Sequence, residues 1–238
     1  MTKMLHSVRF PGESRQYRRA RNELLQAEIG LRRYIGKVAA LRRRLPLGSE
    51  LEQDYVFEEG APDLTDRNTV RQVKMSELFR PGKDSLLLYS FMYSPSMKQP
   101  CPMCTSMLDG LHGSVAHATQ RINFAIVAKS PIHRIRDFAR QRGWINFRIV
   151  SSAKNTYNRD YHGETADGDQ IPALNVFVRR GDKLRHFYNT ELLFVRPERG
   201  QHPRHVDLLW PLWNLFDLTP EGRGTDWYPK LAYPGSGG

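Results

Sequence analysis

The chain has 238 residues, of which 39% are apolar, and it carries a formal net charge of +11. This length and composition suffice for one domain with its own core plus an extension. No run approaches the roughly 20 apolar residues that span a bilayer, and the start lacks the apolar core of a signal peptide. These features exclude a membrane-spanning protein and favour a cytoplasmic one.

The positive charge is concentrated at the beginning of the chain. Residues 1–45 contain twelve Lys or Arg against three Glu, and so supply nine of the eleven net charges. Such a segment can attract nucleic acid or anionic lipid. An organelle presequence is a further interpretation, and the three Glu weigh against it. Because no recognition motif accompanies the charge, a solvated helix face is favoured over nucleic-acid binding.

Apolar residues in this basic arm alternate three and four positions apart, which predicts one helix with a single apolar seam. The seam consists of Tyr17, Ala20, Leu24, Ala27, Leu31, Tyr34, Val38, Leu41 and Leu45. Ser14 or Glu13 begins the helix and Pro46 ends it. The seam needs a partner, and we expect the arm, residues 1–49, to dock on the globular body or to form a homodimer.

Strand and helix patterns alternate downstream. Strands are predicted at 55–57, 85–93, 123–128 and 146–150, and helices at 76–79, 101–120 and 130–142. The 85–93 run is almost continuously apolar and flanked by turn residues, which is typical of a buried central strand. Ser130 and Pro131 form an N-cap followed by proline at the first helical position. A polar connection over 151–170 follows.

The last third of the chain predicts a hairpin and a closing helix. Residues 172–178 and 183–188 flank the turn Arg179-Arg180-Gly181-Asp182, which is a β-hairpin pattern. An apolar stretch at 206–218 predicts a final helix that Pro211 either kinks or begins. Residues 231–238 are predicted to be a flexible tail after a globular domain at 50–230.

The two cysteines of the chain lie three apart, in Pro100-Cys101-Pro102-Met103-Cys104, between a predicted strand and a predicted helix. The helix dipole favours a thiolate on a sulfur at its N-terminus, here Cys101. Cys104 follows one turn later, within reach to form a disulfide. Such a pair exchanges two electrons without a cofactor or metal, and in a reducing compartment it is catalytic or metal-binding rather than structural.

The predicted mechanism makes Cys101 the nucleophile. Its helix-terminal position, with Lys98 nearby in sequence, predicts a pKa lowered from about 8.5 toward neutrality. Cys104 then resolves the mixed disulfide. The intervening Pro102 and Met103 are the expected substrate contacts. Peroxide that oxidises Cys101 to a sulfenic acid is a variant of the same chemistry.

Two alternatives come from a different class of function. Thiolates and thioethers suit Cu(I), and four methionines lie near the pair in sequence: Met92, Met97, Met103 and Met107. A strand, a turn and a helix would orient them in different directions, which disfavours a copper carrier. The other alternative is a binding module that keeps its cysteines without turnover.

The order of elements is similar to that of a thioredoxin-like fold. The segment Ile171-Pro172-Ala173-Leu174 resembles the Ile-Pro-Thr-Leu strand of thioredoxins, where the proline is cis and faces the cysteine pair. By that resemblance Pro172 is cis and catalytic, and the backbone at Ile171 pairs with an extended substrate. A trans proline opening a strand is the more common situation.

Further motifs resemble a bacterial thioredoxin-like family of predicted dithiol-disulfide oxidoreductases, otherwise a domain of unknown function. They are Leu41-Arg42-Arg43-Arg44-Leu45-Pro46, Tyr89-Ser90-Phe91-Met92-Tyr93, Gly143-Trp144, Ser151-Ser152, Asn158-Arg159-Asp160 and Asp217-Leu218-Thr219-Pro220-Glu221-Gly222-Arg223. The family often has Gly where this chain has Met103. The resemblance implies an α/β, thioredoxin-like, three-layer fold with a central mixed sheet, and exchange with a disulfide-bearing protein or a small-molecule thiol.

Overall fold

The computed structural model describes residues 5–206 and 208–234. The chain forms two compact units, residues 1–46 and residues 47–238, which are called the arm and the body below. Within the described residues, no helix combines the length and the apolar composition needed to cross a membrane. The functional boundaries predicted at 49 and 230 stay predictions.

The arm consists mainly of helix α1 (Arg15–Arg43). The Ser14 hydroxyl accepts a hydrogen bond from the Tyr17 amide at 3.1 Å, which satisfies one of the free amides that begin a helix. The predicted start at Ser14 and end before Pro46 are therefore confirmed. No described residue of α1 is buried.

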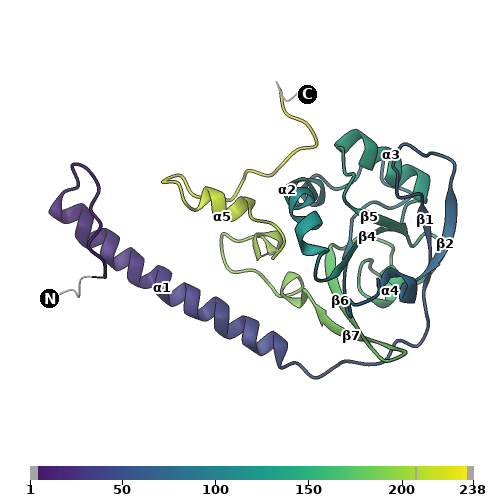
Figure 1. Ribbon diagram of the computed structural model, residues 1–238. Helices are drawn as coiled ribbons and strands as arrows, with labels where there is room; N and C mark the ends of the chain where they lie inside the picture. Colours follow the sequence, from purple (N-terminus) through teal and green to yellow (C-terminus); the bar gives the residue numbers. More distant parts are fainter. Residues whose placement is uncertain (1–4, 207, 235–238) are drawn as a thin grey trace. The chain divides into compact units, whose positions relative to one another are not determined.

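The body is built on one seven-stranded mixed sheet with the order β2-β1-β5-β4-β3-β6-β7 (Figure 1). The strands are β1 (Val56–Gly60), β2 (Val70–Lys74), β3 (Ser85–Ser90), β4 (Asn123–Ala128), β5 (Arg148–Ser151), β6 (Ala173–Arg180) and β7 (Lys183–Asn189). Strands β3, β4 and β5 are parallel, and the other pairings are antiparallel. No hydrophobic pattern predicts β2, because Val73 is its only buried residue.

Helices and short turns of 3-10 helix cover both faces of the sheet. They are η1 (Met75–Leu78), α2 (Pro102–Ala118), α3 (Ile132–Arg142), α4 (Tyr157–Asp160), η2 (Glu191–Leu193), η3 (Pro203–Val206) and α5 (Leu212–Phe216). Alternation along β3 divides the core. Tyr89 packs with α2 and α3 on one face, whereas Leu86 and Leu88 pack with η1 and α4 on the other. The predicted three-layer α/β arrangement is confirmed.

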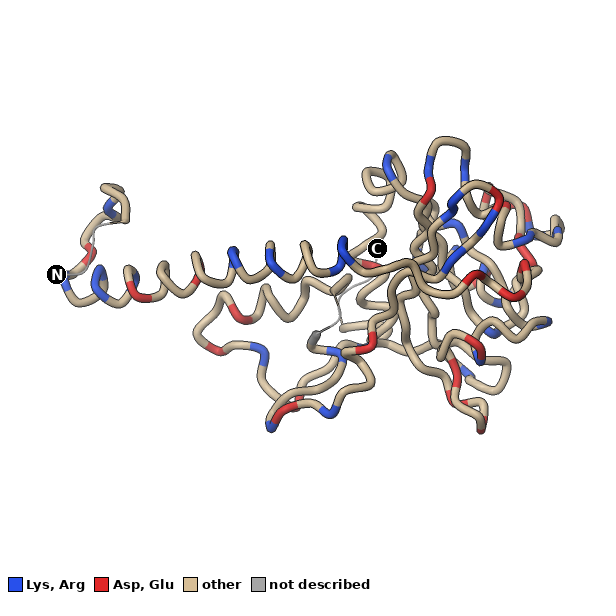
Figure 2. Tube along the Cα trace, turned by 90° about the horizontal axis from the view of Figure 1, so that it is seen from below, with Lys and Arg blue, Asp and Glu red and all other residues tan. Residues whose placement is uncertain are grey.

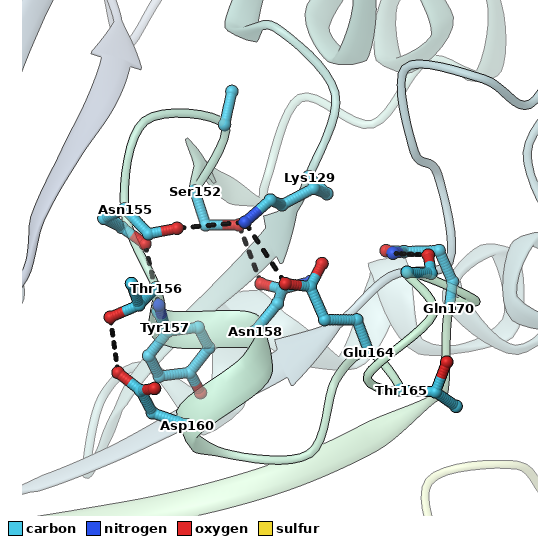
Figure 3. A network of polar contacts seen from close by, with 12 residues as sticks. Lys129, Ser152, Asn155, Thr156, Tyr157, Asn158, Asp160, Glu164, Thr165 and Gln170 are labelled. Atoms are coloured by element: carbon cyan, nitrogen blue, oxygen red, sulfur yellow. Dashed lines mark hydrogen bonds and ion pairs between the residues drawn. The ribbon is translucent and has the colours of Figure 1, made fainter.

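The connection between β5 and β6 is held by polar contacts (Figure 3). The Lys129 ammonium donates to the Asn155 carbonyl at 2.9 Å and lies 3.4 Å from the Glu164 carboxylate. The Ser152 hydroxyl donates to the Asn158 side chain at 2.7 Å. These contacts order a long polar loop, and they fix the path by which the chain enters β6.

Two predicted helices differ in extent from the structure. The final helix, predicted over 206–218, is the shorter α5. The alternative in which Pro211 begins it is confirmed, since Pro211 is its N-cap and proline supplies no amide to continue a helix through it. At α3 the predicted N-cap, Ser130, is wrong by one residue, because the N-cap is Pro131, with φ and ψ of −54° and 144°. The Ser130 amide donates to the Tyr93 carbonyl at 2.9 Å.

Candidate functional site

The cysteine pair forms the start of helix α2, as predicted. Cys101 is the N-cap, and its sulfur accepts a hydrogen bond from the Cys104 amide at 3.5 Å. Its own amide donates to the Met92 carbonyl at 3.1 Å, which ties the pair to the end of the preceding strand. Both residues are free thiols. Cys104 is fully buried, whereas Cys101 retains 8% exposure.

An arginine of α3 holds the loop that leads into the pair. The Arg134 guanidinium donates to the carbonyls of Ser94 and Pro95 at 3.1 and 3.0 Å, and to that of Lys98 at 3.2 Å. The same group lies 4.4 Å from the centre of the Tyr93 ring. The rigid Arg134 guanidinium therefore fixes several carbonyls of residues 93–98, so the position of Cys101 is set by α3 as well as by α2.

The inner sulfur has polar partners of its own. The Tyr89 hydroxyl lies 3.6 Å from Cys104 Sγ, and Arg204 Nη1 lies 3.5 Å from the same atom. Arg204 Nη2 also donates to the Tyr89 oxygen at 3.1 Å. Arg204 is only 4% exposed, and its guanidinium lies 5.4 Å from the centre of the Trp210 ring. A buried cation thus stands beside a buried thiol.

These surroundings place the negative charge on the inner sulfur. Burial alone raises the pKa of Cys104, but the hydrogen bond from Cys101 and the charge of Arg204 outweigh it and lower the pKa to about 5. The hydrogen bond to Cys104, together with burial, raises the pKa of Cys101. The two directions favour a Cys104 thiolate beside a Cys101 thiol.

The pKa predicted for Cys101 is therefore wrong in direction. A lowered pKa was expected from the helix terminus and from the charge of Lys98. Lys98, however, is exposed, and the cation that acts on the pair is Arg204. Arg204 lies in η3, a hundred residues from Cys104 in the sequence, and no sequence motif predicts its contact with the pair. Tyr89 could have been found, because the predicted central strand and its alternation place it on the face that α2 covers.

The prediction that Pro172 is cis is also wrong, since the described residues contain no cis peptide bond. Pro172 does lie at the expected edge of the sheet, because the next residue, Ala173, pairs with Ser90 at the end of β3. The Ile171 amide, however, donates to the Gly163 carbonyl at 2.9 Å. That amide is engaged within the loop, and the bond takes the trans form favoured by most X-Pro bonds. The roles predicted for Pro172 and Ile171 stay predictions without geometric support.

The two residues between the cysteines differ in exposure. Pro102 is exposed at the first position of α2, where a proline fits because its missing amide has no partner in the helix. Met103 is partly buried against the core that contains both thiols. Their predicted contact with substrate stays a prediction, although Pro102 lies on the accessible side of the pair.

The methionines near the pair pack in the same core cluster. Met97 Sδ already accepts a hydrogen bond from the Ser94 amide at 3.4 Å. Within residues 5–206 and 208–234, no group of three or more His, Cys, Asp or Glu is placed to hold a metal ion. The Arg204 charge beside Cys104 also opposes a second cation at that sulfur.

The topology and the position of the pair define an α/β protein of the thioredoxin-like class. Central strand β3 leads into the Cys-x-x-Cys helix, with parallel β4 on one side and the antiparallel β6–β7 hairpin on the other. The chain belongs to a family described as bacterial protein of unknown function (DUF899), whose model matches residues 7–233. The predicted family is thus confirmed.

Solved structures that resemble the chain are distant in sequence. Reduced 2-Cys peroxiredoxin from Plasmodium vivax is 16% identical, with a TM-score of 0.45, over 60% of this chain and 83% of that one. AhpC from Enterococcus faecalis is 12% identical, with a TM-score of 0.43, over 66% and 83%. A secreted disulfide oxidoreductase from Mycobacterium tuberculosis is 15% identical, with a TM-score of 0.36, over 61% and 85%. No curated protein matches the chain.

Proposed function

We propose that the protein is a thiol-disulfide oxidoreductase in which Cys101 and Cys104 alternate between dithiol and disulfide. The observation that carries this proposal is the placement of the inner sulfur 3.5 Å from a buried arginine, at the start of a helix whose N-cap is the other sulfur. A guanidinium within hydrogen-bond distance of a buried thiol stabilises the ionised form of that thiol. An ionised thiol next to a second thiol is the reactive form of a redox pair.

The first chemical step begins with a proton transfer within the pair. The Cys101 proton passes to the Cys104 thiolate, and the Cys101 thiolate attacks one sulfur of a substrate disulfide. The substrate S–S bond breaks, a mixed disulfide forms, and one thiolate departs. Cys101 remains the attacking residue because it is the more exposed of the two sulfurs. Cys104 serves as its proton acceptor.

The second step resolves the mixed disulfide. Cys104 gives its proton to the departing thiolate and is again a thiolate, which Arg204 stabilises. It attacks Cys101 Sγ, so that the Cys101–Cys104 disulfide forms and the second substrate sulfur leaves as a thiolate, which takes a proton from solvent. The substrate disulfide has gained two electrons and two protons; both electrons and one proton come from the protein pair, and the other proton comes from solvent. An external dithiol returns the pair to its reduced form, so the exchange can run in either direction.

The burial of the pair favours a small substrate. A cysteine that is only 8% exposed admits a small disulfide or a peroxide more readily than a disulfide held in a folded protein. With peroxide, the Cys101 thiolate takes one oxygen and becomes a sulfenic acid, and the departing hydroxide takes the proton held by Cys104 and leaves as water. The Cys104 thiolate then closes the disulfide, and the hydroxide that it displaces takes a proton from solvent. We propose the same cytoplasmic, reducing setting for both substrates.

Turnover measurements test the proposal. The protein is mixed with dithiothreitol as donor and with a small disulfide such as bis(2-hydroxyethyl) disulfide, insulin or hydrogen peroxide as acceptor. We expect turnover of a small acceptor, no turnover by C101A, and a mixed disulfide trapped on C104A that mass spectrometry detects. The proposal is contradicted if the wild type turns over no acceptor faster than dithiothreitol alone, or if C101A is as active as the wild type.

A further inference from the structure

Helix α1 exposes an apolar seam that no described residue of the arm, from residue 5 onward, covers. Tyr17, Leu31 and Tyr34 are 49%, 59% and 63% exposed, and the helix has no buried residue. The three-and-four spacing of the seam runs unbroken from Tyr17 to Leu45, which is the pattern of a coiled coil. Lys and Arg recur along the same helix, with Glu23 and Glu28 among them (Figure 2). A helix of this kind is marginal in water without a packing partner.

We propose that the seam of α1 pairs with the seam of a second copy of the chain, with the two helices antiparallel. The protein would then be a homodimer joined through its arms. This inference does not rest on the redox chemistry proposed above. Two independent features of the sequence, the sizes of the seam residues and the charges beside them, favour this orientation over the parallel one.

Antiparallel pairing matches small seam residues with large ones. The opposed pairs are Tyr17 with Leu41, Ala20 with Val38, Leu24 with Tyr34, and Ala27 with Leu31. In a parallel pair each residue would face its own copy, so that Ala20 and Ala27 would form underfilled layers and Tyr34 an overfilled one. Interdigitation of large and small residues gives the close packing that a stable helix interface needs.

The charges that flank the seam lead to the same orientation. In the antiparallel pair, Glu23 of each copy lies beside Lys37 of the other, which gives two attractive contacts by symmetry. In a parallel pair Glu23 would face Glu28, and Lys37 would face Arg42, so both contacts would be repulsive. Neither Glu23 nor Lys37 forms an ion pair with the described residues of its own chain, within 5–206 and 208–234.

Antiparallel pairing brings one like-charged contact, between the two copies of Glu28 at the centre. Its repulsion is reduced, because Arg21 of the same helix lies 3.7 Å from the Glu28 carboxylate. On the other side of the centre Gly30 faces its own copy, and the absence of a side chain there lets the helices approach closely. The centre of the proposed interface is therefore compatible with close contact.

Charge exchange at the two flanking positions tests both the dimer and its orientation. The full chain and its variants are compared by sedimentation equilibrium under reducing conditions. We expect E23K and K37E each to raise the dimer Kd by about tenfold, because two attractive pairs become repulsive. The double variant E23K/K37E should return to the wild-type Kd. R33E makes the same charge change as K37E on the outer face of the helix, and should alter the Kd by less than about threefold.

Each other outcome overturns the proposal in an identifiable way. If E23K and K37E each tighten the dimer, the helices are parallel, since both changes convert a parallel repulsion into an attraction. If the wild type is a monomer at every concentration up to about 100 μM, which is far above a Kd typical of a stable interface, the seam is covered by the body of its own chain. Circular dichroism of each variant confirms that the body remains folded, so that lost association is not mistaken for unfolding.

Discussion

The two faces of the central sheet are packed by the same strands but differ in chemistry. The face under α4 has an apolar and aromatic cluster that includes Tyr55, Phe57 and Phe177. The face under α2 and α3 has an equally buried cluster, yet it also holds two thiols and the buried Arg204. Alternation along the strands explains both cores, and both faces bury a charged group. On the first face Glu59, which is 6% exposed, is paired with Arg71 and Arg148. On the second face the buried arginine lies beside a thiol, which identifies that face as the chemical one.

The largest expected effect comes from removing the inner thiol. C104A removes the buried sulfur that accepts a hydrogen bond from Arg204 Nη1, and we expect a loss of about 3 kcal/mol in the free energy of unfolding. C101A is the matched control, because Cys101 retains 8% exposure and the Arg204 guanidinium donates to the other sulfur, and it should cost less than half as much. Urea unfolding under reducing conditions measures both. Equal losses would show that the arginine does not depend on the thiolate.

Removing the cation should affect reactivity more than stability. R204M leaves Cys104 in a desolvated position without a counter-charge, so the pKa of Cys104 should rise from about 5 toward or beyond the free value of about 8.5. R204K keeps a positive charge and should retain a lowered pKa. The thiolate absorbance near 240 nm, followed against pH, gives the pKa directly. A profile for R204M that overlays the wild type would show that Arg204 does not set the charge on the pair.

The stability of the wild type relative to C104A should depend on pH in one direction. The pKa of Cys104 is lower in the folded chain than in the unfolded chain, so its stabilising contribution is present above the unfolded pKa and is lost as the pH falls toward 5. The difference in unfolding free energy should thus increase between pH 5 and about 8.5, by at most about 1.4 kcal/mol per pH unit. A difference that is flat over this range would contradict a buried thiolate.

The smallest effect is expected on the opposite face. The Tyr55 hydroxyl donates to the Asp160 carboxylate at 2.9 Å, and Y55F should cost about 1 kcal/mol without altering the thiolate titration. Y161F, on a neighbouring ring, is the control. Burial raises the pKa of Tyr161 to about 12, and Y161F should lower the free energy of unfolding by less than Y55F does. If Y55F shifts the pKa of Cys104, the two faces are coupled and the contrast between them fails.

Local patterns were enough to predict most of the elements, because their signals lie within a few residues. Strand β4 occupies the predicted 123–128, and Cys101 is the N-cap of α2. Contacts between residues that lie far apart in the sequence could not be predicted from these local patterns. Arg204 approaches Cys104 from a segment without periodicity, and the geometry of Pro172 depends on a loop whose path local sequence does not fix. The ionisation of the pair was therefore mispredicted although both of its members were identified.

Whether the cysteine pair is a reversible two-electron couple can be measured by equilibrating the protein with defined ratios of reduced and oxidised dithiothreitol, followed by acid quenching, alkylation and mass analysis. We expect a single transition with n = 2, in which Cys101 and Cys104 become protected from alkylation together and the unalkylated protein loses two hydrogens. Thiols that stay fully alkylatable at every ratio, or that oxidise only between chains, would contradict it.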